Sequence, residues 1–158
     1  MTTSTPTKTL AQWEAELPEA PKPVAAYVPT VKTGNLLYTS GVLPMQAGQL
    51  AHAGALTPDD PQAIANGQAA ARLCLMNALA LIKDAAGSLN NVARVVKLVG
   101  FVSSSAAFYN QPQVVNGASE LLLDVFGEEI GKHARSAVGV AALPLNASVE
   151  LELIVELK

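Results

Sequence analysis

The chain has 158 residues, of which 50% are hydrophobic and 15% charged, and its formal net charge is -3. A chain of this length forms one domain with one core, which buries roughly two thirds of the surface that the unfolded chain exposes. Its lysines and arginines form no cluster, and this argues against nucleic acid as a partner, because binding to a phosphate backbone needs a basic surface.

The lone cysteine and the N-terminal residues bear on the compartment. Cys74 is the only cysteine, so the chain can form no internal disulfide, and it lies in an apolar helical pattern that is typical of core packing. A reducing, cytoplasmic location fits this composition. The N-terminal residues lack a continuous apolar segment, and no apolar run approaches the ~18 residues that span a bilayer. We therefore expect neither secretion nor insertion into a membrane.

A short amphipathic helix is predicted at the N-terminus. Thr9 and Gln12 have the spacing of a capping box, and Pro18 ends the pattern. The apolar positions between them have helical spacing and are Leu10, Trp13 and Leu17. Residues 18–26 are too rich in proline for regular structure and are predicted to form an extended connector.

The next segment predicts a β-hairpin followed by a loop. Residues 28–33 and 36–40 are apolar and β-branched segments on either side of the turn-prone pair Gly34-Asn35. Residues 41–57 contain glycines and small polar residues without a clear period. They indicate a long loop or an irregular strand.

The second half of the chain predicts longer elements. A helix begins in residues 58–61 and ends at Gly87, and the nearly continuous apolar segment 92–102 is typical of a central strand. A second helix is predicted over residues 112–126. The chain then closes with two strands, over residues 137–143 and 149–157, which we expect to pair as an antiparallel hairpin.

This order of elements indicates an α+β sandwich in which helices pack on one face of a mixed β-sheet. The opposite face of the sheet would then need a cover, and the low charge of the chain favours another subunit as that cover.

The last strand alternates apolar residues with carboxylates. Glu150, Glu152 and Glu156 share the face that points away from the core with Ile154, and next neighbours on one face of a strand lie only ~7 Å apart, so this face must be solvated or compensated by cations. For Glu152 and Glu156 we expect a solvated strand face.

Arg135 lies on the predicted partner strand, before a run of small residues that leaves room for a ligand or for close approach of a subunit. Its planar guanidinium can bind a carboxylate through two parallel hydrogen bonds. The same group can form a salt bridge to the glutamate strand. From the residues alone, a ligand clamp and a cross-strand salt bridge are both open.

Three segments resemble motifs of the Rid family, which is also called YjgF. The C-terminal signature of that family is similar to His133-Ala-Arg-Ser-Ala-Val-Gly-Val-Ala-Ala-Leu-Pro144 and the following Val149-Glu-Leu-Glu152. Its N-terminal motif is similar to Tyr27-Val28, Gly34-Asn-Leu-Leu-Tyr-Thr-Ser-Gly41 and Pro44, and its mid-chain helix motif to the segment around Asn116. The resemblance covers residues 22–158. The whole chain, residues 1–158, is expected to form a single Rid-like domain. Residues 1–21 and part of the 46–60 loop are additions to the compact core of that family.

The resemblance implies a chorismate-mutase-like (bacillus-type) α+β fold, with two main helices on one face of a mixed sheet. It also implies a homotrimer whose sheets face inward, with three sites at the subunit interfaces. Active members hydrolyse enamine or imine intermediates, such as 2-aminoacrylate, to 2-keto acids and ammonia without a cofactor.

The resemblance also assigns roles to residues. Arg135 would hold the substrate carboxylate, and Glu150 would orient or activate the attacking water. The residues that would line the pocket or contact the ligand are Tyr27, Ser40, Gly41, Asn116, Ser136 and Ala137. Ala137 stands where many members carry a cysteine, so we expect no thiol chemistry. His133 stands where proline is frequent, and we interpret it as an exposed turn residue.

Two other functions remain open at this stage. The first is a non-catalytic module in which Arg135 holds a 2-keto acid or an amino acid for regulation. The second is an endoribonuclease or translation inhibitor, following the older family label endoribonuclease L-PSP, and the negative net charge disfavours it. Two distant histidines and one helical cysteine do not make a zinc ligand set, so we predict no metal.

Overall fold

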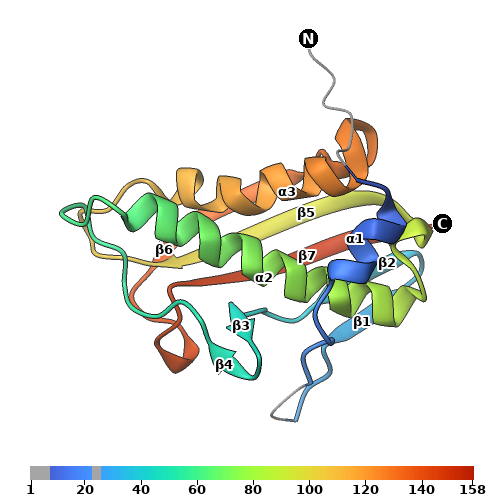
Figure 1. Cartoon of the computed structure of the whole chain (residues 1–158), viewed down its shortest axis with the longest axis horizontal. Coiled ribbons are helices and arrows are strands. Elements are labelled where there is room, and N and C mark those ends of the chain that lie inside the picture. Colours follow the sequence, from blue (N-terminus) through green and yellow to red (C-terminus); the bar gives the residue numbers. More distant parts are fainter. Residues whose placement is uncertain (1–7, 23–25) are drawn as a thin grey trace.

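The protein is described here by a computed structural model, which covers residues 8–22 and 26–158. Two long helices pack on one face of a five-stranded sheet (Figure 1). The helices are α2 (Ala63–Ala86) and α3 (Gln111–Gly131). The strands, in their order across the sheet, are β1 (Thr30–Thr33), β2 (Leu36–Thr39), β7 (Val149–Leu157), β5 (Val92–Ser103) and β6 (Ala134–Val140). The predicted α+β architecture, with a mixed sheet and helices on one face, is confirmed.

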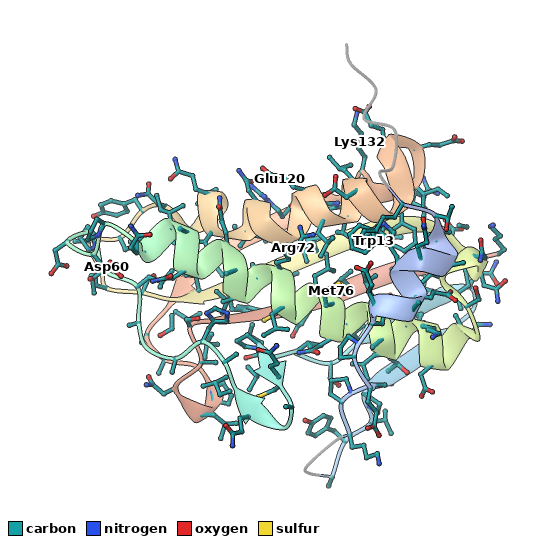
Figure 2. The ribbon with its side chains drawn as sticks, viewed as in Figure 1. Trp13, Asp60, Arg72, Met76, Glu120 and Lys132 are labelled. Carbon is teal, nitrogen blue, oxygen red and sulfur yellow. The ribbon has the colours of Figure 1, made fainter. Side chains whose placement is uncertain are left out.

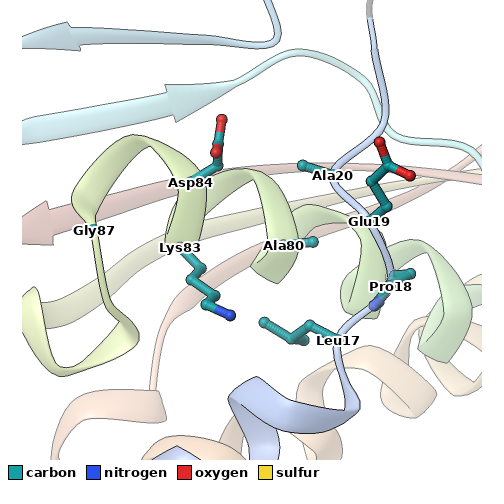
Figure 3. A pocket seen from close by; sticks show the side chains of 8 residues that line it. All are labelled: Leu17, Pro18, Glu19, Ala20, Ala80, Lys83, Asp84 and Gly87. Carbon is teal, nitrogen blue, oxygen red and sulfur yellow. The ribbon is translucent and has the colours of Figure 1, made fainter.

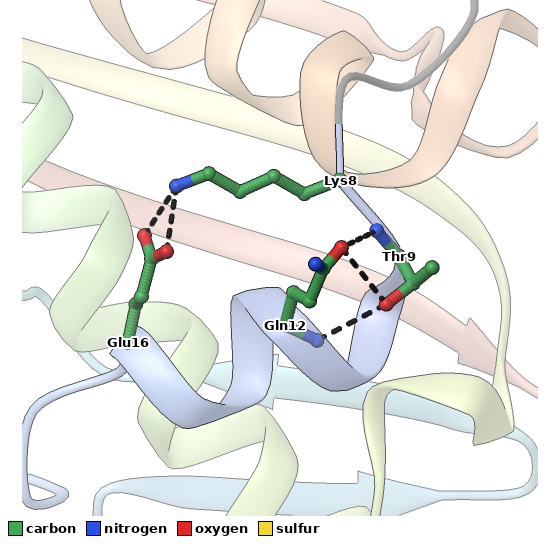
Figure 4. Close-up of polar contacts among 4 residues, drawn as sticks. All are labelled: Lys8, Thr9, Gln12 and Glu16. Atoms are coloured by element: carbon green, nitrogen blue, oxygen red, sulfur yellow. Dashed lines mark hydrogen bonds and ion pairs between the residues drawn. The ribbon is translucent and has the colours of Figure 1, made fainter.

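The N-terminal helix α1 (Leu10–Glu16) begins with the predicted capping box. The Thr9 side chain accepts from the Gln12 backbone N–H, and Gln12 Oε1 accepts from Thr9 N at 2.8 Å (Figure 4). Lys8 reaches over the ring of Trp13, 4.5 Å from its centroid, and its Nζ lies 2.6 Å from the Glu16 carboxylate. Of the predicted connector, residues 18–22 have no regular structure and residues 23–25 lie outside the described part of the chain.

Glu14 fastens α1 to the rest of the molecule. Its Oε1 accepts from the backbone N–H of Leu89 at 2.5 Å and from the hydroxyl of Ser88 at 2.8 Å, at the start of the 3-10 helix η1 (Leu89–Asn91). Trp13, also on α1, is buried in the core. The N-terminal helix is therefore part of the packed domain.

The first hairpin is present, with shorter strands than predicted. β1 starts at Thr30 and β2 ends at Thr39, and they pair antiparallel around Gly34, whose φ of 57° lies in the left-handed region. The following segment contains a small hairpin of β3 (Met45–Gln46) and β4 (Gln49–Leu50), which the sequence pattern did not resolve. The rest of this segment is joined to the sheet by single bridges, such as Val42 to Leu151.

The predicted C-terminal hairpin is wrong. β6 pairs in parallel with β5, whereas β7 lies between β2 and β5 and is antiparallel to both. The chain crosses from β6 to β7 through the 3-10 helix η2 (Pro144–Asn146). The physical reason is burial: the apolar face of β7 is completely covered by the helices, so it belongs at the centre of the sheet, while the small residues of β6 bury little area at its edge.

Both main helices lie close to their neighbours. A methyl group at Gly117 on α3 would overlap the carbonyl oxygen of Gln68 on α2, so this glycine permits the close crossing of the two helices.

Helix α3 was expected to end at Phe126, but the chain makes a kink at Gly127, with φ of 72°, and the helix continues to Gly131. Cys74 is completely buried on α2, as predicted, and burial raises the pKa of its thiol.

The two faces of the molecule differ. Polar side chains such as Arg72 and Glu120 lie on the outer surface of the helix layer (Figure 2). On the face of the sheet away from the helices, several apolar side chains are exposed, among them Val31, Tyr38 and Val138 at 55%, 37% and 43%. No helix within the described ranges has the length and apolar character to cross a membrane. The cytoplasmic location stays a prediction.

Candidate ligand-binding site

Arg135 points from the edge strand β6 toward α3. Its Nη1 donates to Asn116 Oδ1 at 2.8 Å and to Ser119 Oγ at 3.1 Å. Both partners are neutral, and within residues 8–22 and 26–158 no carboxylate forms an ion pair with this guanidinium. The cross-strand salt bridge left open by the sequence is not formed, because β5 separates Arg135 from the glutamate strand.

One edge of the Arg135 guanidinium has no hydrogen-bond partner among the described residues. Nη1 carries both hydrogen bonds to α3, and the described residues accept none from Nε or Nη2. These two nitrogens form the fork that fits the two oxygens of a carboxylate. The side chain is half-buried, so such a contact would be less screened than one at the surface.

Helix α3 supplies the two residues that hold Arg135. Asn116 and Ser119 are three positions apart and therefore lie on the same face of the helix. Asn116 was predicted from the family motif, but Ser119 was not. The spacing of three from Asn116, on a predicted helix, is the signal that could have found it.

His133 is not the exposed turn residue that the sequence suggested. It is half-buried, with Nδ1 2.7 Å from the carbonyl oxygen of Gly131 and Nε2 3.1 Å from Ser119 Oγ. Burial lowers the pKa of the imidazole; the hydrogen bond to Gly131 acts in the opposite direction, and the charge of Arg135 lowers the pKa further. The ring is therefore neutral at neutral pH.

Glu150 lies on the opposite face of the sheet, beside Gly41. Its carboxylate occupies the space that a side chain at position 41 would need, so only glycine permits this contact. Burial raises the pKa of Glu150, and the nearby Glu152 carboxylate raises it further. A carboxylate with a raised pKa is a stronger base than an ordinary glutamate.

A cavity of about 640 Å³ adjoins Gly41, Ser40 and Tyr27. Ser40 Oγ donates to Val28 O at 2.7 Å, which fixes the rim, and Tyr27 is half-exposed. On the inner wall the buried Asn77 donates to the carbonyl oxygens of Leu43 and Met45, at 3.1 and 2.9 Å. The cavity is thus built from rigid elements on this side.

A second cavity, of about 350 Å³, lies between the connector and the end of α2. Lys83, Asp84 and Leu17 contribute to its wall (Figure 3). It contains none of the residues that the sequence predicted for a site, and Lys83 is partly engaged with the carbonyl oxygen of Glu14 at 3.5 Å. We therefore place the candidate site near Arg135 and near Gly41 and Glu150, and not at this cavity.

The predicted site residues fall into two separate groups within one chain. One is the rim cluster, which consists of Tyr27, Ser40, Gly41 and Glu150. The other is the arginine cluster, which consists of Arg135, Asn116 and Ala137. Arg135 and Glu150 lie on opposite faces of the sheet, with β5 between their strands and therefore about 10 Å of strand spacing between them.

Ser136 belongs to neither group. It points to the face away from α3 and accepts a hydrogen bond from Lys97 Nζ at 3.0 Å. It is separated from the Arg135 guanidinium by the sheet itself, since neighbouring residues of a strand point to opposite faces.

Comparisons with known proteins identify the family. The family described as "YjgF/chorismate mutase-like, putative endoribonuclease" matches residues 8–157. The chain belongs to the YjgF/Rid family. Its chorismate-mutase-like α+β fold, which the resemblance implied, is confirmed.

Three relatives are similar to this chain over most of its length. Protein TCP17 of Trypanosoma cruzi is 47% identical over 148 residues, which are 90% of this chain and 88% of that protein. The crystal structure of Atu1372 from Agrobacterium tumefaciens, a protein described as having unknown function, is also 47% identical, with a TM-score of 0.85 over 94% of this chain and 92% of that one. A 2-iminobutanoate/2-iminopropanoate deaminase of Dermatophagoides farinae is 31% identical over 140 residues, 87% of this chain and 91% of that protein.

Proposed function

We propose that this protein hydrolyses enamine or imine intermediates, such as 2-aminoacrylate, to 2-keto acids and ammonia. The observation that carries the proposal is the guanidinium of Arg135, which neutral partners hold in place while its Nε and Nη2 have no hydrogen-bond partner among the described residues. A charged fork without a carboxylate partner suits the carboxylate of a substrate. The name of the mite relative, an imine deaminase, supports the same reaction.

The reaction requires a group that anchors the substrate carboxylate, a water molecule and a proton acceptor. The imine form of the substrate carries its carboxylate next to the C=N carbon, so binding of the carboxylate to Arg135 fixes the position of that carbon. Glu150 takes a proton from water as the oxygen bonds to the carbon, and the proton returns to the nitrogen. In the resulting carbinolamine the hydroxyl proton passes to the nitrogen as the C=O bond forms and the C–N bond breaks, and the 2-keto acid and ammonia are released. The step consumes one water and needs neither a metal nor a cofactor.

We further propose that the site is completed by another copy of the chain, in a homotrimer. Arg135 and Glu150 lie on opposite faces of the sheet, so a site that uses both needs two chains. Among the described strands β6 lies at the edge of the sheet, and the face of the sheet away from the helices carries exposed apolar side chains, so both surfaces are suited to such contacts.

The decisive experiment follows pyruvate release from 2-aminoacrylate that a serine dehydratase generates. We expect the wild-type protein to accelerate this release and Arg135→Lys to lose most of the acceleration, because lysine keeps the charge but not the fork. Arg72→Lys is the matched control, since Arg72 is exposed on the helix layer. A wild-type protein without effect on pyruvate release contradicts the proposal. Thermal stabilisation by 2-oxobutanoate in that case would identify a non-catalytic carboxylate-binding regulator instead.

A further inference from the structure

A chain of hydrogen bonds leads from Arg135 through α3 to the turn before β6. Arg135 Nη1 lies 3.1 Å from Ser119 Oγ, and the same oxygen lies 3.1 Å from His133 Nε2. On the other side of the ring, His133 Nδ1 lies 2.7 Å from the carbonyl oxygen of Gly131, at the end of α3. The imidazole thus touches both the helix terminus and the hydroxyl that holds the arginine.

The chemistry of the groups fixes the direction of each bond. A carbonyl oxygen only accepts, so His133 Nδ1 carries the hydrogen and donates to Gly131. A guanidinium only donates, so Ser119 Oγ accepts from Arg135 and keeps its own hydrogen free. In a neutral ring protonated at Nδ1, Nε2 is an acceptor, and the hydroxyl of Ser119 donates to it. All three contacts are satisfied together in this one arrangement.

A charged imidazole would break this arrangement. Its Nε2–H would donate to Ser119 Oγ, which already accepts from the Arg135 cation, so two positive groups would converge on one oxygen. Burial and the charge of Arg135 both lower the pKa of His133 and so favour the neutral ring. The ring therefore has the protonation state that the contacts to Ser119 and Arg135 require.

We propose that His133 is a positioning residue, which acts through Ser119 to hold the Arg135 guanidinium with its Nε and Nη2 edge open toward a ligand carboxylate. The inference rests on the proposed role of Arg135 as the carboxylate anchor. Asn116 holds the same nitrogen at 2.8 Å and, among the described residues, shares no hydrogen bond with His133, so only the Ser119 support of the arginine depends on the imidazole.

A merely structural role for His133 would depend on its bond to Gly131, and a positioning role depends on its bond to Ser119. Two substitutions separate these contacts. In His133→Asn the amide nitrogen replaces Nδ1, which keeps the bond to Gly131 but leaves Ser119 without its acceptor. In His133→Gln the longer side chain places its oxygen near the position of Nε2, which keeps the acceptor for Ser119 and gives up Gly131.

The experiment measures the dissociation constant of 2-oxobutanoate, an unreactive 2-keto acid, by titration calorimetry. Loss of one hydrogen bond predicts roughly five- to tenfold weaker binding for His133→Asn, whereas His133→Gln should retain affinity within about twofold. Ser119→Ala should reproduce the loss without touching the Gly131 contact, and in that background the Asn and Gln variants should bind equally. Lys132→Ala, an exposed neighbour paired with Glu128, is the matched control and should bind like the wild type.

Two results would overturn the inference, and they differ in meaning. If the wild type and Ser119→Ala bind 2-oxobutanoate equally well, or if the Asn and Gln variants of His133 lose the same affinity, His133 does not position Arg135, while the carboxylate anchor stands. If the wild type binds no 2-keto acid, the proposed role of Arg135 fails and this inference fails with it.

Discussion

The carboxylate of Glu150 is partly removed from water by its contact with Gly41 and its place on the sheet. Burial and the Glu152 charge favour the protonated form and raise the pKa of Glu150. A carboxylate accepts a proton from water only while it is ionised. The proposed reaction should therefore slow as the pH falls through a value above that of an ordinary glutamate.

This expectation is tested by the pH dependence of kcat/KM for imine hydrolysis. The wild type should lose activity on the acid side with one ionisation. Glu150→Gln should lower kcat/KM by roughly 100-fold or more, and its residual rate should lack that acid limb, because the amide does not titrate in this range. An unchanged profile in Glu150→Gln would show that another group is the base.

Gly41→Ala offers a sharper comparison, because it keeps the carboxylate and displaces it. The added methyl group would overlap the Glu150 side chain, whose flexible end can move away with little loss of stability. We expect kcat to fall while the unfolding transition in urea stays close to that of the wild type. A fully active Gly41→Ala would mean that the position of Glu150 is unimportant for the reaction.

At the scale of elements, the hydrophobic period identified each long helix and strand of the chain but not the pairing of the last two strands. The capping box of α1 and the bounds of β7 agree with the sequence pattern. Helix α2 begins at Ala63, after the predicted start in residues 58–61, and β6 spans Ala134–Val140, where a strand over residues 137–143 was expected. A period shows which face of a strand is buried and says nothing of its neighbour. The position of β7 between β2 and β5 depends on how much surface area each strand buries, which is a property of the assembled sheet.

The same limit explains what the sequence could show of the site. Arg135 was identified by its chemistry together with the family signature, and the structure adds that its partners are neutral. Its separation from Glu150 follows from the strand order and could not be predicted while the two strands were expected to pair. A serine such as Ser119 has no chemistry that marks it as a site residue. Its contact with Arg135 depends on the direction in which the Arg135 guanidinium points, and the structure shows that direction.

The hydrogen bonds from Ser88 and Leu89 to Glu14 join α1 to η1 and lead to a prediction about stability. Glu14→Ala removes the acceptor of the Leu89 N–H, which lies at a buried residue, and should lower the free energy of unfolding by about 1–3 kcal/mol. Glu16→Ala, on the same helix, removes only a surface ion pair with Lys8 and should cost less than about 0.5 kcal/mol. Urea unfolding of the two variants measures the difference in their free energies of unfolding. Equal losses of this free energy would show that the Glu14 hydrogen bonds do not stabilise the fold.

At the scale of the whole molecule, the proposed homotrimer would use the face of the sheet that points away from the helices. Its exposed apolar side chains should lie at the interfaces of the proposed homotrimer. Tyr38→Glu places a charge there and should shift the mass measured by light scattering toward a single chain, with loss of imine hydrolysis. Tyr109→Glu is the matched control, because Tyr109 is exposed just before α3. A wild-type protein that is already monomeric would contradict the trimer.

The placement of Arg135 and Glu150 on opposite faces has a consequence for inheritance. Suppose that each site combines Arg135 of one copy with Glu150 of another. A chain with a defective Arg135 then inactivates the one site to which it contributes the arginine, whereas its Glu150 still completes the site of a copy with an intact Arg135. In a cell that makes both normal and Arg135-deficient chains, the mixed assemblies keep some complete sites and lose others. The severity of such an allele would then follow the ratio in which the two chains are made.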